Sequence, residues 1–509
     1  MPKQRHLHMV TAAVLLLIFV ISLDARAVDT AMPTVVSQLG ELSLFSWVFA
    51  AFTITSTTTV PLFGRLSDMY GRKPFVLVGI GFFLSGSLLC GQAQSMQQLV
   101  LFRGFQGIGA GALKPLTLTV LADIFPLEQR ARLQTFVSGA FGAGPVLAPL
   151  VAGFLVLHVD WHWIFYLIVP PCLLAGLLLY WSMDEQWEPE SALSIDYGGA
   201  FLLTAAIVLG LLGLLQTGKT HGWAGPQLLG LFGGSGLLLT GFLVMERRTP
   251  QPLVPLDIFR NRIVAAASIS GFFTSMAIWS TTAFVPLFIQ GVLGHSAITA
   301  GASVAPLTLI WVVSSSIGGF VLLKRGYRVT AGLALAMVIT GGYLLTQLGI
   351  TSSYQQAILA VSLVGFGGMA LLAFLLSLQN AVGLRQRGII TGASEFSRGL
   401  GGAIGVSLTG SLLNRQLNGR VLALLPAAAS KTDPANIARL ASPQALLDPA
   451  VRAGLPEPTL HALQLALSGA LTAAFLVPFI AAVCALVSSL WLPGGRAADH
   501  VVLAQEPVA

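Results

Sequence analysis

Residues 64–74 read Gly-Arg-Leu-Ser-Asp-Met-Tyr-Gly-Arg-Lys-Pro, a short polar stretch between two long apolar runs. Apolar residues fill most of 45–63 before it and of 75–89 after it. Each run is long enough to cross a bilayer, which takes about 20 residues as a helix. The stretch is therefore predicted to be a tight turn between two membrane helices. Arg65, Arg72 and Lys73 place this turn on the cytoplasmic face, where membrane proteins concentrate positive charge.

The glycines and the acidic residue of this stretch have separate predicted roles. Gly64 and Gly71 allow a sharp turn and a close approach of helices, because glycine has no side chain to clash. Asp68 is placed either to accept hydrogen bonds from a helix N-terminus or to pair with Arg72, four residues further on. A basic loop would explain the positive charges alone, but not this spacing of Gly, Asp, Gly, Arg and Lys.

The composition supports a polytopic membrane protein. Of the 509 residues, 55% are hydrophobic and only 9% are charged, whereas a soluble protein has about 25% charged residues. The net charge of +7 does not indicate a nucleic-acid partner, because most of the basic residues fall in short loops on one predicted side. The three cysteines lie in or beside apolar runs and indicate no disulfide framework.

Fourteen apolar spans are predicted from the hydropathy pattern. They cover residues 10–33, 44–63, 75–92, 97–122, 133–157, 162–182, 197–216, 226–245, 264–290, 299–323, 329–349, 355–380, 389–413 and 465–491. An even number places both termini on the same side, and the distribution of basic residues makes that side the cytoplasm. A cleaved signal peptide at the N-terminus is disfavoured, because cleavage would leave an odd number of spans. The long loop 414–463 is then external, with short amphipathic helices expected at 442–447 and 456–463. A surface loop and a docking site for a partner both remain open for it.

A faint internal repeat predicts two related halves. The segment Gly319–Arg328 echoes the first motif, because Gly319 and Gly326 keep its seven-residue spacing and the segment contains basic Lys324, Arg325 and Arg328. Leu323 stands where the first copy has Asp68. Two homologous six-helix halves fit this echo. The predicted division is 1–190 for the first bundle, 191–250 for two inserted transmembrane helices, and 251–509 for the second bundle.

Seven ionisable residues fall inside predicted spans, where a charge costs at least about 2.5–3.5 kcal/mol and is a functional candidate by default. They are Asp24, Arg26 and Asp29 in the first span, Arg103 and Lys114 in the fourth, and Glu395 and Arg398 in the thirteenth. A structural ion pair and a functional role stay open for Arg26 with Asp29, and likewise for Glu395 with Arg398, because each pair is three residues apart. Asp24 points away from Arg26, which favours a functional role for Asp24.

The fourth span carries its polar residues on one face. Arg103, Gln106, Gly107, Ala110 and Lys114 share this face, and about 16 Å of helix separates Arg103 from Lys114. The face is expected to line a central substrate cavity rather than contact lipid.

These motifs together resemble the major facilitator superfamily. Residues 64–73 match its G-x-L-x-D-x-x-G-R-[RK] signature at every position, and Arg103 to Gly107 resembles its R-x-x-q-G motif. Gly142 to Pro145 resembles the antiporter motif G-x-x-x-G-P-x-x-G-G, although alanine or proline replaces three of its glycines. The segments Leu23–Pro33, Trp161–Tyr166 and Pro252–Arg262 resemble further motifs of the fourteen-span drug:proton antiporter branch. Together with the span count, they make the chain similar to this branch. In the first-span motif, Arg26 replaces a threonine and Asp29 an asparagine, so both add charge.

The resemblance implies an all-α membrane protein with fourteen transmembrane helices, arranged as two six-helix pseudo-symmetric bundles plus two inserted helices. It implies a proton-coupled exporter of hydrophobic or amphiphilic small molecules, not an enzyme, in the plasma (inner) membrane. The first and fourth spans are neighbours in this fold, which brings Arg103 near Asp24 or Asp29. The expected proton-coupling residues are Asp24, Asp29 and Glu395; the expected substrate-cavity residues are Arg26, Arg103, Gln106, Lys114 and Arg398; and the expected conformational motif is Gly64, Asp68, Gly71, Arg72, Lys73, Gly144 and Pro145.

The expected partners are a small-molecule substrate, protons and the lipid bilayer, with no nucleic acid, cofactor or metal, and the protein is expected to be a monomer. The need for a periplasmic adaptor stays open. Two rival functions remain. One is an exporter or flippase of a lipid or an anionic amphiphile, suggested by four positive against three negative buried charges. The other is a non-transporting sensor, which the intact motif and the costly buried charges disfavour.

Overall fold

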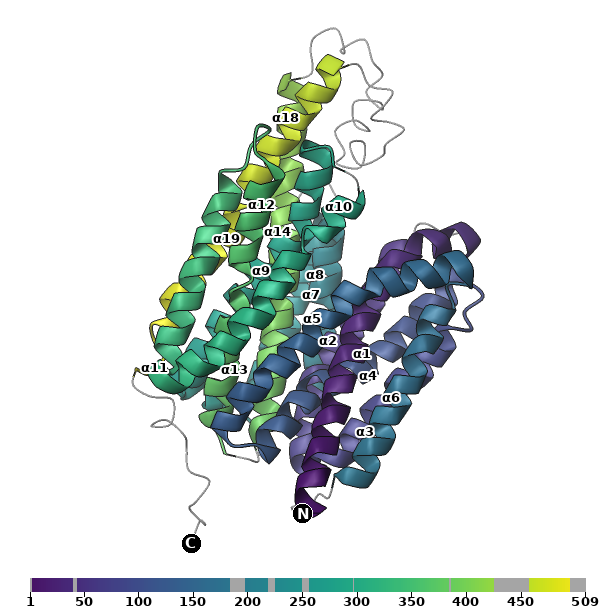
Figure 1. The fold of residues 1–509 in the computed structure, drawn as a ribbon, viewed down its shortest axis with the longest axis vertical. Coiled ribbons are helices and arrows are strands. Elements are labelled where there is room, and N and C mark those ends of the chain that lie inside the picture. Colours follow the sequence, from purple (N-terminus) through teal and green to yellow (C-terminus); the bar gives the residue numbers. More distant parts are fainter. Residues whose placement is uncertain are drawn as a thin grey trace.

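The computed structural model describes residues 2–494 except for 40–43, 184–196, 218–224, 250–255, 296, 384–385 and 425–456. Helices make up nearly all of the described chain (Figure 1). The first six pack together into one bundle: α1 (Pro2–Leu39), α2 (Phe45–Tyr70), α3 (Arg72–Cys90), α4 (Met96–Ile124), α5 (Leu127–His158) and α6 (Trp163–Ser182). Within it α4 packs on α2 and α3, and α1 packs on α5 and α6.

Two inserted helices follow the first bundle, and the remaining helices form a second bundle. The inserted helices α7 (Tyr197–Thr217) and α8 (Pro226–Glu246) pack on each other, and α7 also contacts α2 and α14. The second bundle contains η2 (Leu256–Arg260), α9 (Arg262–Leu287), η3 (Phe288–Val292), α10 (Ala297–Ala302), α11 (Ala305–Thr346), α12 (Tyr354–Val364), α13 (Gly367–Asn380), α14 (Arg387–Leu424), α18 (Glu457–Ala474) and α19 (Leu476–Ser489).

Local sequence sets several helix boundaries. The Ser95 side chain accepts the N–H of Gln98 and caps α4, and Ser353 with Gln356 forms a capping box at the start of α12. Gly71 has a φ of 99°, a conformation that favours glycine, and separates α2 from α3. Gly326 has a φ of 80° and divides α11 into two helices in the same way.

Among the described residues, ten helices are long and apolar enough to cross a membrane. One of them runs from Thr299 to Thr346 and therefore includes two of the predicted spans, on either side of Gly326. The helices α2, α7 and α14 are not among the ten, although each covers a predicted span. Large apolar side chains such as Leu101, Phe201 and Leu237 are more than two-thirds exposed, which suits contact with lipid.

The predicted outer loop is shorter than expected. The helix α14 continues to Leu424, beyond the predicted limit of 413, and α18 begins at Glu457. The predicted surface helix at 456–463 is therefore the first part of α18, which leads into the last candidate span. The other predicted surface helix, 442–447, lies outside the described residues.

The two bundles approach each other at one end and diverge at the other (Figure 1). We call the end at which α2 meets α3 the motif end; the N-terminus lies there too. The opposite end is the far end. The bundles contact each other through α2, α4 and α5 of the first and α11, α13 and α14 of the second.

Candidate functional site

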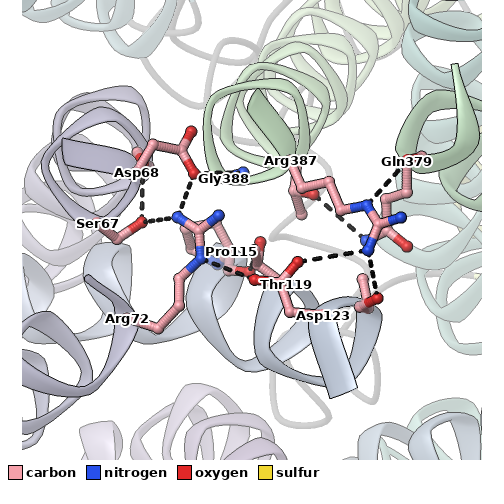
Figure 2. A network of polar contacts seen from close by, with 12 residues as sticks. Ser67, Asp68, Arg72, Pro115, Thr119, Asp123, Gln379, Arg387 and Gly388 are labelled. Carbon is pink, nitrogen blue, oxygen red and sulfur yellow. Dashed lines mark hydrogen bonds and ion pairs between the residues drawn. The ribbon is translucent and has the colours of Figure 1, made fainter. Parts of the chain in front are cut away.

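A network of polar contacts joins the two bundles at the motif end (Figure 2). Asp68, at the end of α2, forms an ion pair with Arg72. Its two carboxylate oxygens also accept the backbone N–H groups of Gly388 at 3.0 Å and Ile389 at 2.6 Å. These N–H groups are the first of α14, so both roles considered for Asp68 occur together: it pairs with Arg72 and it caps a helix of the other bundle.

Arg72 extends the network into the first bundle. Its Nη1 donates to Ser67 Oγ at 2.9 Å, and its Nε lies 2.9 Å from Asp123 Oδ2, near the end of α4. Arg387, at the start of α14, approaches the other oxygen of Asp123 at 3.5 Å and donates to the carbonyl of Ala122 at 2.7 Å. Asp123 is thus held by one arginine from each bundle.

Two glycines let the helices come this close. A Cβ on Gly64 would lie 2.8 Å from the carbonyl oxygen of Gly388. A Cβ on Gly388 would lie 2.7 Å from the carbonyl oxygen of Gly64 and would also meet Asp68 and Arg72. Both distances are too short for real contacts, so any larger residue here would push α2 and α14 apart.

A second link at the motif end comes from α5. Arg130 donates to Gln379 Oε1 at 3.1 Å and to Asn380 Oδ1 at 2.6 Å, at the end of α13. Asn380 in turn donates to the hydroxyl of Tyr327 at 2.7 Å, next to Gly326. The sequence did not single out Arg130, Gln379 or Asn380 for this role.

A buried charged cluster lies inside the first bundle. Asp24 of α1 is 0% exposed, and its Oδ2 lies 2.9 Å from Arg103 Nη1. Gln106 donates to the other Asp24 oxygen at 3.2 Å and accepts from Arg103 at 2.7 Å. The guanidinium carbon of Arg103 also lies 4.1 Å from the ring centroid of Phe52. Asp24, one of the two acidic partners considered for Arg103, is therefore in contact with it.

Close packing fixes α4 and α5 around this cluster. A Cβ on Gly107 would lie 2.6 Å from the carbonyl oxygen of Phe52, so Gly107 brings α4 against α2. A Cβ on Gly144 would lie 2.6 Å from the backbone nitrogen of Leu23, so Gly144 and the adjoining Pro145 bring α5 against α1 beside Asp24. These glycines are needed for the close approach of the helix backbones.

The residues of the predicted cavity face of α4 have different surroundings in this structure. Arg103 and Gln106 are at most 1% exposed and face Asp24, so they do not line an open cavity in this conformation. Lys114 is half-buried further along the same helix. It lies within electrostatic range of Asp24 and of Glu395, which belongs to the other bundle.

The remaining predicted site residues are placed as follows. Glu395 and Arg398 form an ion pair within α14. Arg26 is exposed, on a different side of α1 from Asp24. The side chain of Asp29 lies outside the described residues, so the expected Arg26–Asp29 pair is not described. The amine of Lys73 lies 5.3 Å from the ring centroid of Tyr180 in α6.

The fold and these contacts define a membrane protein with two helical bundles, closed against each other at one end by charged side chains. The profile of the Major Facilitator Superfamily matches residues 14–406, and the chain belongs to this family. Proteins of the family are multi-pass membrane transporters, not enzymes.

The chain is similar to Multidrug resistance protein 3 of Bacillus subtilis (strain 168), with 32% identity over 499 residues that cover 97% of this chain and 96% of that protein. It is also similar to Multidrug transporter protein MdtP of the same strain, with 32% identity over 416 residues, 81% of this chain and 76% of that protein. Among solved structures, the human organic anion transporter MFSD10 (TETRAN) matches with a TM-score of 0.60 and 16% identity, over 93% of this chain and 99% of that one. At that identity the likeness concerns the fold alone.

Proposed function

We propose that this protein is a proton-coupled exporter of hydrophobic or amphiphilic small molecules that works by alternating access in the plasma (inner) membrane. The names of its relatives as multidrug transporters support the substrate class. The observation that carries the proposal is Asp24, a fully buried carboxylate held by Arg103 and Gln106 between α1 and α4. A buried, paired carboxylate in a transporter is suited to exchange a proton, because losing its charge disrupts the pair.

The proposed topology has fourteen spans with both termini in the cytoplasm. The helices α2, α7 and α14, together with the division of α11 at Gly326, bring the ten candidate spans to this number. The motif end is then cytoplasmic, because the basic residues of the motif gather there. Cysteines introduced at Ser430 and Ser191 should be labelled from outside and from inside, respectively. Labelling of Ser191 from outside intact cells would contradict this topology.

In the proposed cycle, the described conformation is closed toward the cytoplasm by Asp68 and Arg130 and opens to the outside. A proton reaching Asp24 from outside neutralises it and weakens its hold on Arg103. Substrate leaves, the motif end opens, and the proton is released to the cytoplasm. The proposed alternative proton carriers are Glu395 and Asp29. The proposed substrate contacts are Arg26, Lys114 and Arg398, and also Arg103 and Gln106, which are buried in the described conformation. Substrate and proton alternate because the two access states differ in their contacts.

The test uses purified protein in liposomes with an imposed pH gradient. Asp24→Asn keeps the size of the side chain but cannot release a proton, so gradient-driven efflux should be lost while downhill exchange of substrate stays measurable. A matched control is Asp257→Asn, a carboxylate that is 84% exposed and pairs with Arg260 at the surface. Wild-type gradient-driven efflux in Asp24→Asn would move the coupling role to Asp29 or Glu395. Efflux by the purified protein alone would also show that no periplasmic adaptor is required.

A further inference from the structure

Lys114 is a cation in the interior that needs a compensating partner. It lies within the apolar helix α4, and its neighbours Leu113 and Leu116 are fully buried. Helix α4 ends at Ile124, and about 15 Å of helix separates the two residues. This length is too great for the Lys114 amine to reach the membrane surface easily. A positive charge at such a depth is costly, which makes Lys114 a functional candidate.

The nearby carboxylates are already paired with arginines. Asp24 is bound by Arg103 at 2.9 Å and by Gln106 at 3.2 Å. Glu395 is bound by Arg398, three residues further along α14. Both carboxylates attract Lys114 from a distance. Among the side chains that the structure describes, however, none forms a hydrogen bond or an ion pair with the Lys114 amine.

Among the described side chains, the cluster around Lys114 has one more basic group than it has acidic groups. Arg103, Lys114 and Arg398 are cations, whereas Asp24 and Glu395 are the only carboxylates that the described part of the chain contributes to it. Its members come from α1 and α4 of the first bundle and from α14 of the second, and α4 packs on α14. A group bound at Lys114 would thus contact the surface at which the two bundles move against each other.

We propose that Lys114 binds the anionic group of a transported amphiphile, such as a carboxylate or a sulfonate. The inference rests on the proposed exporter function and specifies the substrate class for one position of the site. An anion here neutralises the excess charge without displacing either arginine pair. The same chemistry would fit the headgroup of an anionic lipid, so the experiment includes both sources.

The experiment uses full-length protein in phosphatidylcholine liposomes with an imposed pH gradient. Three fluorescent probes are compared: the cation ethidium, the anion anilinonaphthalene sulfonate, and labelled phosphatidylglycerol. Lys114→Gln should lower kcat/KM for the sulfonate about 10- to 100-fold, because a charged partner is lost. It should leave ethidium efflux unchanged or faster. Lys114→Arg should stay within a few-fold of wild type for every probe.

Controls separate this inference from the proposed function. Lys324→Gln removes the same charge from an exposed position on α11 and should change none of the three rates. Movement of phosphatidylglycerol, lost in Lys114→Gln, would support the anion site with a lipid as its source. Gradient-driven ethidium efflux without any anion transport would overturn the inference and leave the exporter proposal standing. An equal loss for all probes in well-folded Lys114→Gln would also overturn it, and a wild-type protein that moves no probe would contradict both proposals.

Discussion

Replacing Asp68 with Asn tests the contact that closes the motif end. The carboxylate accepts two N–H groups of α14 and pairs with Arg72, whereas an amide offers a single oxygen acceptor. One charge-assisted hydrogen bond is therefore lost, and Arg72 loses an anionic partner while its contacts with Ser67 and Asp123 stay. Hydrogen bonds to charged groups contribute about 1.5–3 kcal/mol, and the weakened ion pair adds to this loss. The closed state should lose about 2–4 kcal/mol, which is a shift of about 30- to 1,000-fold toward opening.

The assay measures a distance between the bundles at the motif end. Spin labels on cysteines at Glu128 and Gln386 are suitable, because both residues are exposed and each belongs to a different bundle. Two native cysteines, Cys90 and Cys172, are buried, and Cys484 is replaced by serine before labelling. Wild-type protein should show one short distance by double electron–electron resonance. Asp68→Asn should add a longer distance as its main population, and its efflux should be strongly reduced at normal membrane levels.

A control variant keeps the test specific. Arg65→Gln removes a charge from the same motif, but among the described side chains Arg65 forms no hydrogen bond or ion pair with the second bundle. Its distance distribution should match that of wild type. If Asp68→Asn also keeps the wild-type distribution and exports at the wild-type rate, the contact with α14 does not hold the motif end closed, and the reasoning from its geometry is wrong.

Four further variants test three other contacts. Glu395→Gln alone should impair efflux, because it leaves Arg398 without its carboxylate partner. The double change Glu395→Gln with Arg398→Gln should stay inactive if Glu395 also carries protons. Recovery of efflux in liposomes by the double variant would show that the pair is purely structural. Arg130→Gln should destabilise the closed state by about 1–2 kcal/mol, less than Asp68→Asn does, because the acceptors of Arg130 are neutral amides. A larger population of the long distance than in Asp68→Asn would contradict this. Gly388→Ala should prevent closure, since its Cβ would meet Asp68, and a single short distance in this variant would refute the packing argument.

Local pattern was enough to predict the turn of the motif and its echo. Gly71 and Gly326 both adopt positive φ, and they stand at matching positions of the two copies. The Asp68–Arg72 pair was predicted from the four-residue spacing, but it forms across the turn at Gly71, between the end of α2 and the start of α3. Such features depend on a few neighbouring residues, which a single sequence contains.

Contacts between distant parts of the chain were not predictable in the same way. Asp123, Gln379 and Arg387 meet the motif from other helices, and hydropathy carries no information about which helix ends face each other. In the sequence, Arg387 and Arg130 count only as basic residues of the cytoplasmic side. The predicted span ends at residue 413 and the predicted loop begins at 414, whereas the helix α14 continues to Leu424. A helix does not have to end where its apolar segment ends.

The cavity face predicted for α4 differs from the structure for a related reason, and the difference bears on coupling. Helical spacing predicted that Arg103 and Gln106 share a side, but not that Asp24 fills that side. If a proton neutralises Asp24, Gln106 is the acceptor that Arg103 keeps among the described side chains, and Arg103 becomes a poorly compensated buried cation. The helix α1 must then shift relative to α4. Gly144 of α5 packs on Leu23, beside Asp24, and Gly142 of α5 faces Thr308 of α11 in the second bundle. A shift of α1 therefore acts directly on α5, the helix of the first bundle that contacts α11 of the second. This contact links the protonation of Asp24 to the relative movement of the two bundles.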